Sequence, residues 1–124
     1  MNITKLLKMH DVKFNMKKYD LVNETLPTAS GGGVAEFLDH FKDESEILEA
    51  LDQLNYFLNG GVYNVDYESI SIDLYTAVID MEANVVGIYD NSGSGIYDSF
   101  QNIPVLDFKD ILEEWLKFLK KNYY

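Results

Sequence analysis

Apolar and polar residues alternate most clearly in the segment ISIDLY, positions 70–75. Because successive side chains of a strand point to opposite faces, this pattern predicts a strand with one apolar face and one face carrying acids and tyrosines. The runs at 85–89 and 96–101 predict two more strands, with turn-forming residues at 80–84 and 90–95 between them. The stretch from Ile70 to Phe100 therefore predicts an antiparallel meander, around which the rest of the chain packs.

Helical spacing of apolar residues appears on both sides of this stretch. Positions 2–9 predict a short helix, and positions 34–41 and 47–58 predict either a helical pair or one kinked helix. Asp43 is placed to cap the second piece, with Glu46 completing a capping-box-like pair, and the glycines at 60–61 supply a left-handed stop. The acids of this second piece are expected to face solvent: Glu44, Glu49 and Asp52.

The C-terminal segment predicts a longer amphipathic helix. Pro104 ends the last strand because it has no amide donor, and Asp107 is placed to cap the helix. Lysines gather near its C-terminal end, which complements the helix dipole. Its apolar stripe is expected to lie on the sheet and comprises Phe108, Ile111, Leu112, Trp115 and Leu119.

The region between the first two helical segments is harder to assign. Alternation over positions 12–17 predicts an edge strand with lysines on its outer face. The segment NETLPTASGGG, positions 23–33, concentrates turn formers and predicts a loop. Its glycines open a helix, as in phosphate-binding loops, but no strand clearly precedes them and no Lys-Ser/Thr pair follows. A flexible loop is therefore preferred to an anion site.

Together these elements predict a single domain, residues 1–124, of the α+β class. We expect an antiparallel β-meander of about 3–5 strands packed against N-terminal and central helices and a C-terminal amphipathic helix. A chain of 124 residues with 47% hydrophobic residues is sufficient for one core.

Charge narrows the classes of partner. The net charge is −11, and residues 19–108 hold 17 acids and only Lys42, which gives 1 − 17 = −16. Nucleic acid would be repelled by this region. The absence of cysteine excludes disulfides and thiolate chemistry. No segment is typical of a signal peptide or a membrane span, so we expect a cytoplasmic protein with no membrane association.

Candidate catalytic or metal-binding groups are few. His10 and His40 are the two histidines, and neither lies in a recognisable nucleophile motif. Glu36 and His40 are four residues apart on a predicted helix, but such a pair is common on solvated helix faces. The sequence therefore predicts no enzyme activity, no cofactor and no metal site.

One segment resembles a calcium-binding loop as well as a plain hairpin. Positions 90–101, DNSGSGIYDSFQ, match several EF-hand loop positions, from Asp90 at the first to Asp98 at the ninth. Gln101 replaces the closing bidentate glutamate, and both flanks are predicted strands where an EF-hand requires helices. The hairpin is preferred, and calcium binding remains an alternative.

Acids and tyrosines gather in one region of the chain and suggest a surface for a basic protein partner. Tyrosine offers rigid contact area with a polar tip, and carboxylates attract and pair with Lys or Arg. Alternatively, the tyrosines are half-buried strand residues and the acids only solubilise the protein. The candidate partner-binding residues are Tyr63, Asp66, Tyr67, Glu68, Asp73, Tyr75, Tyr89, Asp90, Tyr97 and Asp98.

The small, acidic, cysteine-free α+β pattern and the ending IPVLDFKDILEEWLKFL, positions 103–119, resemble bacterial immunity proteins of polymorphic toxin systems, including contact-dependent growth inhibition. The segment FLNGG, positions 57–61, is similar to the Smi1/Knr4-like immunity superfamily. Either resemblance implies a non-catalytic protein that neutralises one cognate toxin, often a nuclease, by covering its active site. The alternative functions are a protein-interaction adaptor domain or, as a third, a calcium-binding module. The pattern does not predict an oligomeric state.

Overall fold

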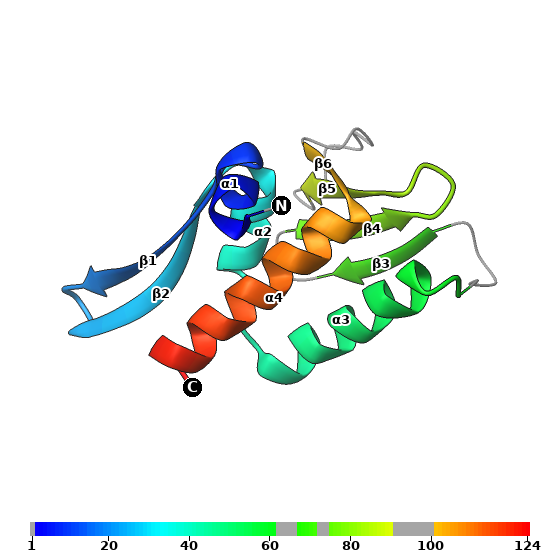
Figure 1. The fold of residues 1–124 in the computed structure, drawn as a ribbon. Coiled ribbons are helices and arrows are strands. Elements are labelled where there is room, and N and C mark those ends of the chain that lie inside the picture. The colour runs from blue at the N-terminus through cyan, green and yellow to red at the C-terminus, as the bar shows by residue number, and fades with distance from the viewer. Residues whose placement is uncertain (1, 62–66, 72–74, 91–100) are drawn as a thin grey trace.

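The computed structural model describes residues 2–61, 67–71, 75–90 and 101–124 of the chain. The predicted α+β class is confirmed (Figure 1). In chain order the elements are α1 (Ile3–Met9), β1 (Val12–Tyr19), β2 (Glu24–Gly31), α2 (Gly33–Asp39), α3 (Glu44–Leu58), β3 (Tyr67–Ser71), β4 (Tyr75–Asp80), β5 (Val85–Asp90), β6 (Gln101–Pro104) and α4 (Val105–Asn122).

Strands β3 to β6 form a four-stranded antiparallel sheet in sequence order, so the predicted antiparallel order is confirmed. Of the strand predicted at 96–101, only Gln101 lies among the described residues, and there it begins β6. The predicted turn at 80–84 is also present, where the Asp80 carboxylate accepts hydrogen bonds from two backbone amides of the turn. The single strand predicted over 70–75 is wrong. It spans the end of β3 and the start of β4, because alternation continues in sequence even where the chain reverses direction.

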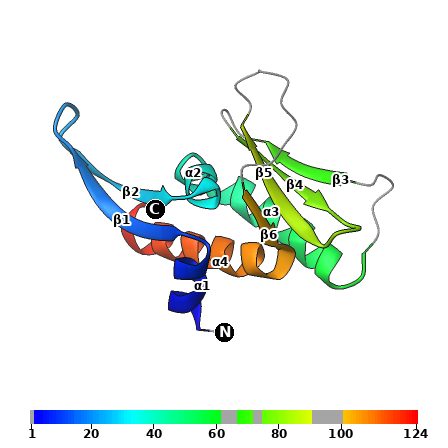
Figure 2. The same ribbon diagram turned by 90° about the horizontal axis from the view of Figure 1, so that it is seen from above.

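Helices cover one face of this sheet. The inward-facing residues Ile70, Ala77, Ile79, Val86, Ile88 and Ile103 are at most 9% exposed. The predicted stripe of α4 is confirmed, since each of its members is fully buried. Figure 2 shows the β1–β2 hairpin and the four-stranded sheet on opposite sides of α2. In the described part of the chain, no helix is long and apolar enough to cross a membrane.

The β1–β2 hairpin corrects one prediction. β1 is a strand as expected, but most of the segment predicted as a loop forms its partner β2, paired from Val12 with Gly31 to Tyr19 with Glu24. Pro27 is tolerated because β2 has a strand neighbour on one side only, among the described strands. The hairpin extends away from the helices as an arm (Figure 1), and Leu21 at its tip is fully exposed.

The glycines at the end of β2 make close backbone contacts with Asp11, where the sequence predicted a flexible loop. Gly31 has a φ of +135°, and a Cβ there would lie 1.9 Å from the carbonyl oxygen of Asp11. The amide of Gly32 donates a hydrogen bond to that same oxygen at 2.9 Å. At the start of α2, the amide of Val34 donates to Gln101 Oε1 at 2.8 Å. The glycines thus allow close backbone approach, and a side chain of β6 binds the amide of Val34.

The helix boundaries confirm one predicted cap and correct the other. The Asp43 carboxylate accepts a hydrogen bond from the amide of Glu46 at 3.0 Å, as predicted. Asp107 does not cap α4, because the helix begins at Val105, directly after Pro104. Instead, Asp107 Oδ2 lies 3.0 Å from His10 Nε2 and joins α4 to the C-terminal end of α1.

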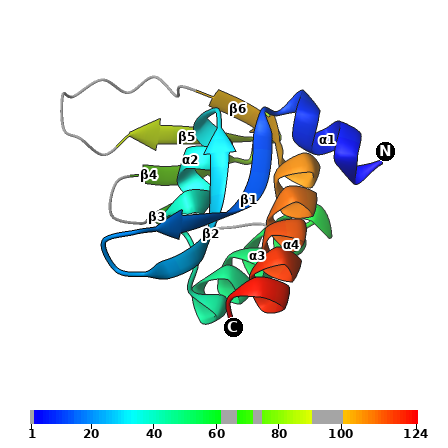
Figure 3. The same cartoon turned by 90° about the vertical axis from the view of Figure 1, so that its left-hand side faces the viewer.

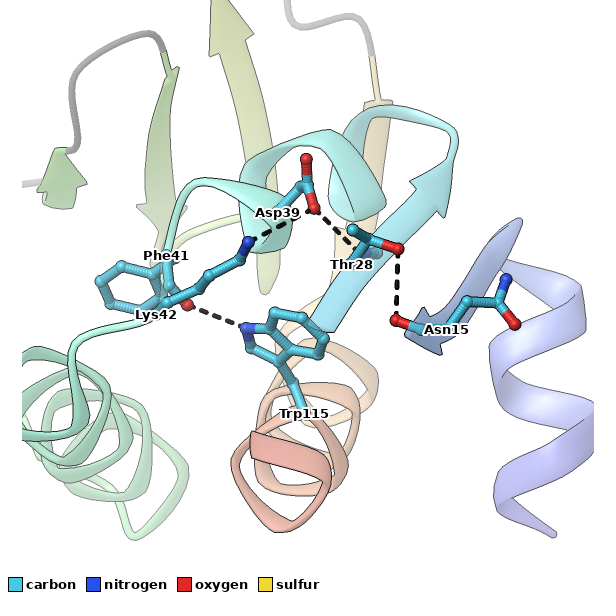
Figure 4. A network of polar contacts seen from close by, with 7 residues as sticks. Asn15, Thr28, Asp39, Phe41, Lys42 and Trp115 are labelled. Carbon is cyan, nitrogen blue, oxygen red and sulfur yellow. Dashed lines mark hydrogen bonds and ion pairs between the residues drawn. The ribbon is translucent and has the colours of Figure 1, made fainter. Parts of the chain in front are cut away.

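Polar contacts join the arm to the helices (Figure 4). The buried Trp115 indole donates a hydrogen bond to the carbonyl of Phe41, between α2 and α3, at 2.8 Å. Asp39 Oδ1, at the end of α2, accepts a hydrogen bond from the amide of Ala29 in β2 at 3.0 Å. The hydroxyl of Thr28 then donates to the carbonyl of Asn15 in β1 at 3.2 Å. These bonds link α4, α2, β2 and β1 through specific side chains.

Candidate partner-binding site

Only part of the predicted binding surface lies among described side chains. Tyr75, Tyr89 and Asp90 are described completely, and the backbone of Tyr67 and Glu68 lies in β3. Outside the described residues are Tyr63, Asp66, Asp73, Tyr97 and Asp98.

The sheet register separates the three described candidates. Tyr75 is paired with Asp90, so both side chains lie on the helix-covered face, at its open end. Tyr89 is paired with Thr76 and lies on the other face of the sheet. Ser71 is paired with Thr76, so Tyr75 lies on the same face of the sheet as Ala77 and its partner Ile70. Continuous alternation through positions 70–75 had predicted that Ile70 and Tyr75 lie on opposite faces.

Tyr75 contacts residues in and directly after α2 that the sequence pattern did not group with it. The hydroxyl of Tyr75 donates a hydrogen bond to Glu36 Oε2 at 3.0 Å. The ring of His40 lies 5.5 Å from the Tyr75 ring, between centroids. We call the group of Glu36, Asp39, His40, Tyr75 and Asp90 the Tyr75 cluster.

Electrostatics in the cluster keep the tyrosine neutral. Burial raises the pKa of Tyr75, and the hydrogen bond to Glu36 and the negative charge of that carboxylate raise it further. Asp90 and Asp39 add smaller effects in the same direction. The phenol is therefore a hydrogen-bond donor beside three carboxylates. Asp39 is itself paired with a cation, since Lys42 Nζ lies 3.9 Å from Asp39 Oδ1.

This arrangement is suited to binding a cationic group. Glu36 and Asp90 are exposed acids, and the hydrogen bond to Glu36 orients the Tyr75 side chain beside that carboxylate. The Glu36–His40 pair, considered as metal ligands from the sequence, is instead part of this tyrosine contact. Among the described residues, no three His, Asp or Glu side chains come together in a metal-binding arrangement.

Sequence reasoning missed the contribution of α2 to this site. Glu36, Asp39 and His40 follow the i, i+3, i+4 spacing that places residues on one helix face. This spacing in the sequence could have predicted that the three side chains lie together. Their approach to Tyr75, which is 39 positions from Glu36, depends on the packing of α2 against β4 and β5.

The proposed calcium loop is only partly described, because residues 91–100 lie outside the described part of the chain. Its two flanks are the antiparallel strands β5 and β6, as the hairpin interpretation required. The side chain of Gln101, at the closing position, is bound to backbone groups. It accepts from the Val34 amide and donates to the carbonyl of His10 at 3.1 Å.

Comparison of the chain with models of protein families, with curated proteins and with solved structures finds no match.

Proposed function

We propose that this protein is an immunity-type inhibitor that binds a basic protein toxin and covers its active or substrate-binding surface. The observation that carries the proposal is the Tyr75 cluster, in which Tyr75 donates a hydrogen bond to Glu36 and is paired with Asp90 across the sheet, on a protein of net charge −11. Toxins that act on nucleic acids carry cationic substrate-binding surfaces, which such a site complements. The inhibitor acts by occlusion and needs no catalytic group.

The residues of the cluster have different roles in this proposal. Glu36 and Asp90 pair with Lys or Arg side chains of the toxin, and Tyr75 supplies contact area next to those charge pairs. The long-range field of the acidic chain accelerates encounter with a cationic partner. The resemblance of positions 103–119 to bacterial immunity proteins supports the same function.

The proposal predicts that a toxin domain is encoded beside the gene of this protein, and the test begins with that domain. Co-expression should protect cells from that domain, and the two purified proteins should form a stable complex. Replacing two carboxylates in Glu36→Gln/Asp90→Asn should slow association by about tenfold at low salt, because charge pairs contribute to the association rate. It should also reduce the salt dependence of association. Stopped-flow fluorescence measures both effects.

The matched control is Glu49→Gln/Asp52→Asn, which removes the same charge from the exposed face of α3. It should slow association much less, since these residues lie outside the cluster. Equal slowing by both variants would show that only net charge matters. Unchanged association of the cluster variant would place the interface elsewhere on the protein.

A further inference from the structure

A groove of about 540 Å³ lies between α1, β1 and the last turns of α4. Figure 3 shows α1 and β1 both beside α4. The apolar residues of the groove are Leu7, Val12, Phe14 and Phe118, and Lys8 and Lys13 provide its positive charge. Thr4 and Asp11 complete the described lining, so Asp11 is the one acid in it.

The floor of the groove is the outer surface of an anchored aromatic cluster. The ring of Phe14 lies 5.0 Å from Trp115 and 5.6 Å from Phe118, between centroids. Trp115 is fully buried below them and is held by its hydrogen bond to the Phe41 carbonyl. Phe14 and Phe118 remain partly exposed. A preformed apolar surface of this kind lowers the entropic cost of binding.

The charge of the groove is opposite to that of the rest of the molecule. Residues 3–19, which form α1 and β1, contain five lysines and one acid, a charge of 5 − 1 = +4. The remainder of the chain therefore carries −11 − 4 = −15. An acidic partner is repelled by that remainder and attracted to the groove, which also offers it apolar contact.

We infer that this groove binds an acidic amphipathic peptide segment of a protein partner. Apolar side chains of the segment contact Phe14 and Phe118, and its carboxylates lie beside Lys8 and Lys13. An anionic membrane is a poorer fit, since the apolar surface is concave and the remaining −15 charge opposes approach to anionic lipid. The groove and the Tyr75 cluster are made by different residues with opposite charge. The inference is therefore independent of the proposed inhibitor function and assigns a second binding surface.

The test uses two displayed libraries of short peptides without tryptophan. Both contain Leu, Ile and Phe at the same frequency, one with Asp and Glu and the other with Lys and Arg. The full-length protein should enrich binders from the acidic library only. Synthetic forms of those binders should change the fluorescence of Trp115, the sole tryptophan, which contacts the groove floor.

Variants locate the binding. Lys8→Glu/Lys13→Glu should weaken binding of the selected peptides at least about tenfold, because two attractive charges become repulsive. The matched control Lys17→Glu/Lys18→Glu changes the same net charge on β1 outside the groove lining, and it should weaken binding much less. Leu7→Gln tests the apolar lining of the groove without changing its charge and should also weaken binding. Circular dichroism establishes that each variant is folded.

Several outcomes overturn the inference. These are no enrichment from the acidic library, equal enrichment from the basic library, or equal loss of binding in the Lys8/Lys13 and Lys17/Lys18 variants. Sedimentation with phosphatidylserine vesicles gives a further measurement. Binding to the vesicles without binding to acidic peptides would identify a membrane surface instead and would also overturn the inference.

Discussion

The four-stranded sheet and the β1–β2 arm share antiparallel pairing, yet only the sheet has a continuous buried face. Ile79 and Ile88 in the sheet are fully buried, whereas Met16 and Leu21 of the arm are 38% and 102% exposed. Helices α2 and α4 cover the inner face of the sheet, but they contact only the base of the arm, where Phe14 packs on Trp115. Pairing alone therefore does not bury a strand, because burial requires a second layer.

The same two regions differ in charge and in the partners proposed for them. The open end of the sheet carries the acidic Tyr75 cluster, and β1 carries lysines beside a groove with an aromatic floor. The described part of the chain thus presents two surfaces of opposite charge.

The largest expected effect comes from truncating a buried residue of the sheet, compared with the same change at an exposed residue of the arm. Ile88→Ala should lower the free energy of unfolding by about 2–5 kcal/mol, because it leaves a cavity under α2 and α4. Met16→Ala should change it by less than about 0.5 kcal/mol, as for other exposed positions. Urea denaturation measures both values. A loss at Met16 as large as that at Ile88 would mean that the arm is covered in solution.

A smaller effect tests how the arm is joined to the body. Gly31→Ala should cost more than the about 1–2 kcal/mol typical of an L residue in left-handed backbone, because its Cβ would also collide with the Asp11 carbonyl. Gly60→Ala is the matched control, since its φ is +87° but nothing lies within 4 Å of the added Cβ. Thermal denaturation should give Gly31→Ala a lower melting temperature than Gly60→Ala. The reverse order would show that the close contact between Gly31 and Asp11 does not stabilise the fold.

The smallest effect concerns the acidic cluster. Glu36→Gln should lower the pKa of Tyr75, because it removes a carboxylate that favours the protonated phenol. Since the pKa of Tyr75 is raised in the folded state, the protonated phenol stabilises the fold. This contribution to the free energy of unfolding is present below the unfolded tyrosine pKa of about 10 and is lost as pH rises through the folded pKa. Near-ultraviolet difference titration against Tyr75→Phe isolates this residue among nine tyrosines. Glu49→Gln on α3 should leave the titration unchanged, and an equal shift there would contradict the local assignment.

The sequence by itself determined the elements whose signals are local. Helical spacing identified α1, α2, α3 and the buried stripe of α4, and Asp43 was predicted as a cap because its partner amide lies three residues away. Strand β5 and the turn before it followed from a strand-forming run preceded by turn residues. These features depend on neighbours within a few positions, which a pattern in the chain records directly.

Only the tertiary structure decided how distant segments meet. β2 was hidden because a strand containing Pro27 and followed by glycines depends on its pairing with β1 rather than on propensity. The face of Tyr75 depended on where the chain reverses before β4, and its contact with Glu36 depended on the packing of α2. The basic groove likewise joins Phe14 with Phe118 from the two ends of the chain. Such contacts arise when layers of helices and strands pack together. The local pattern of residues does not record which distant residues then face one another.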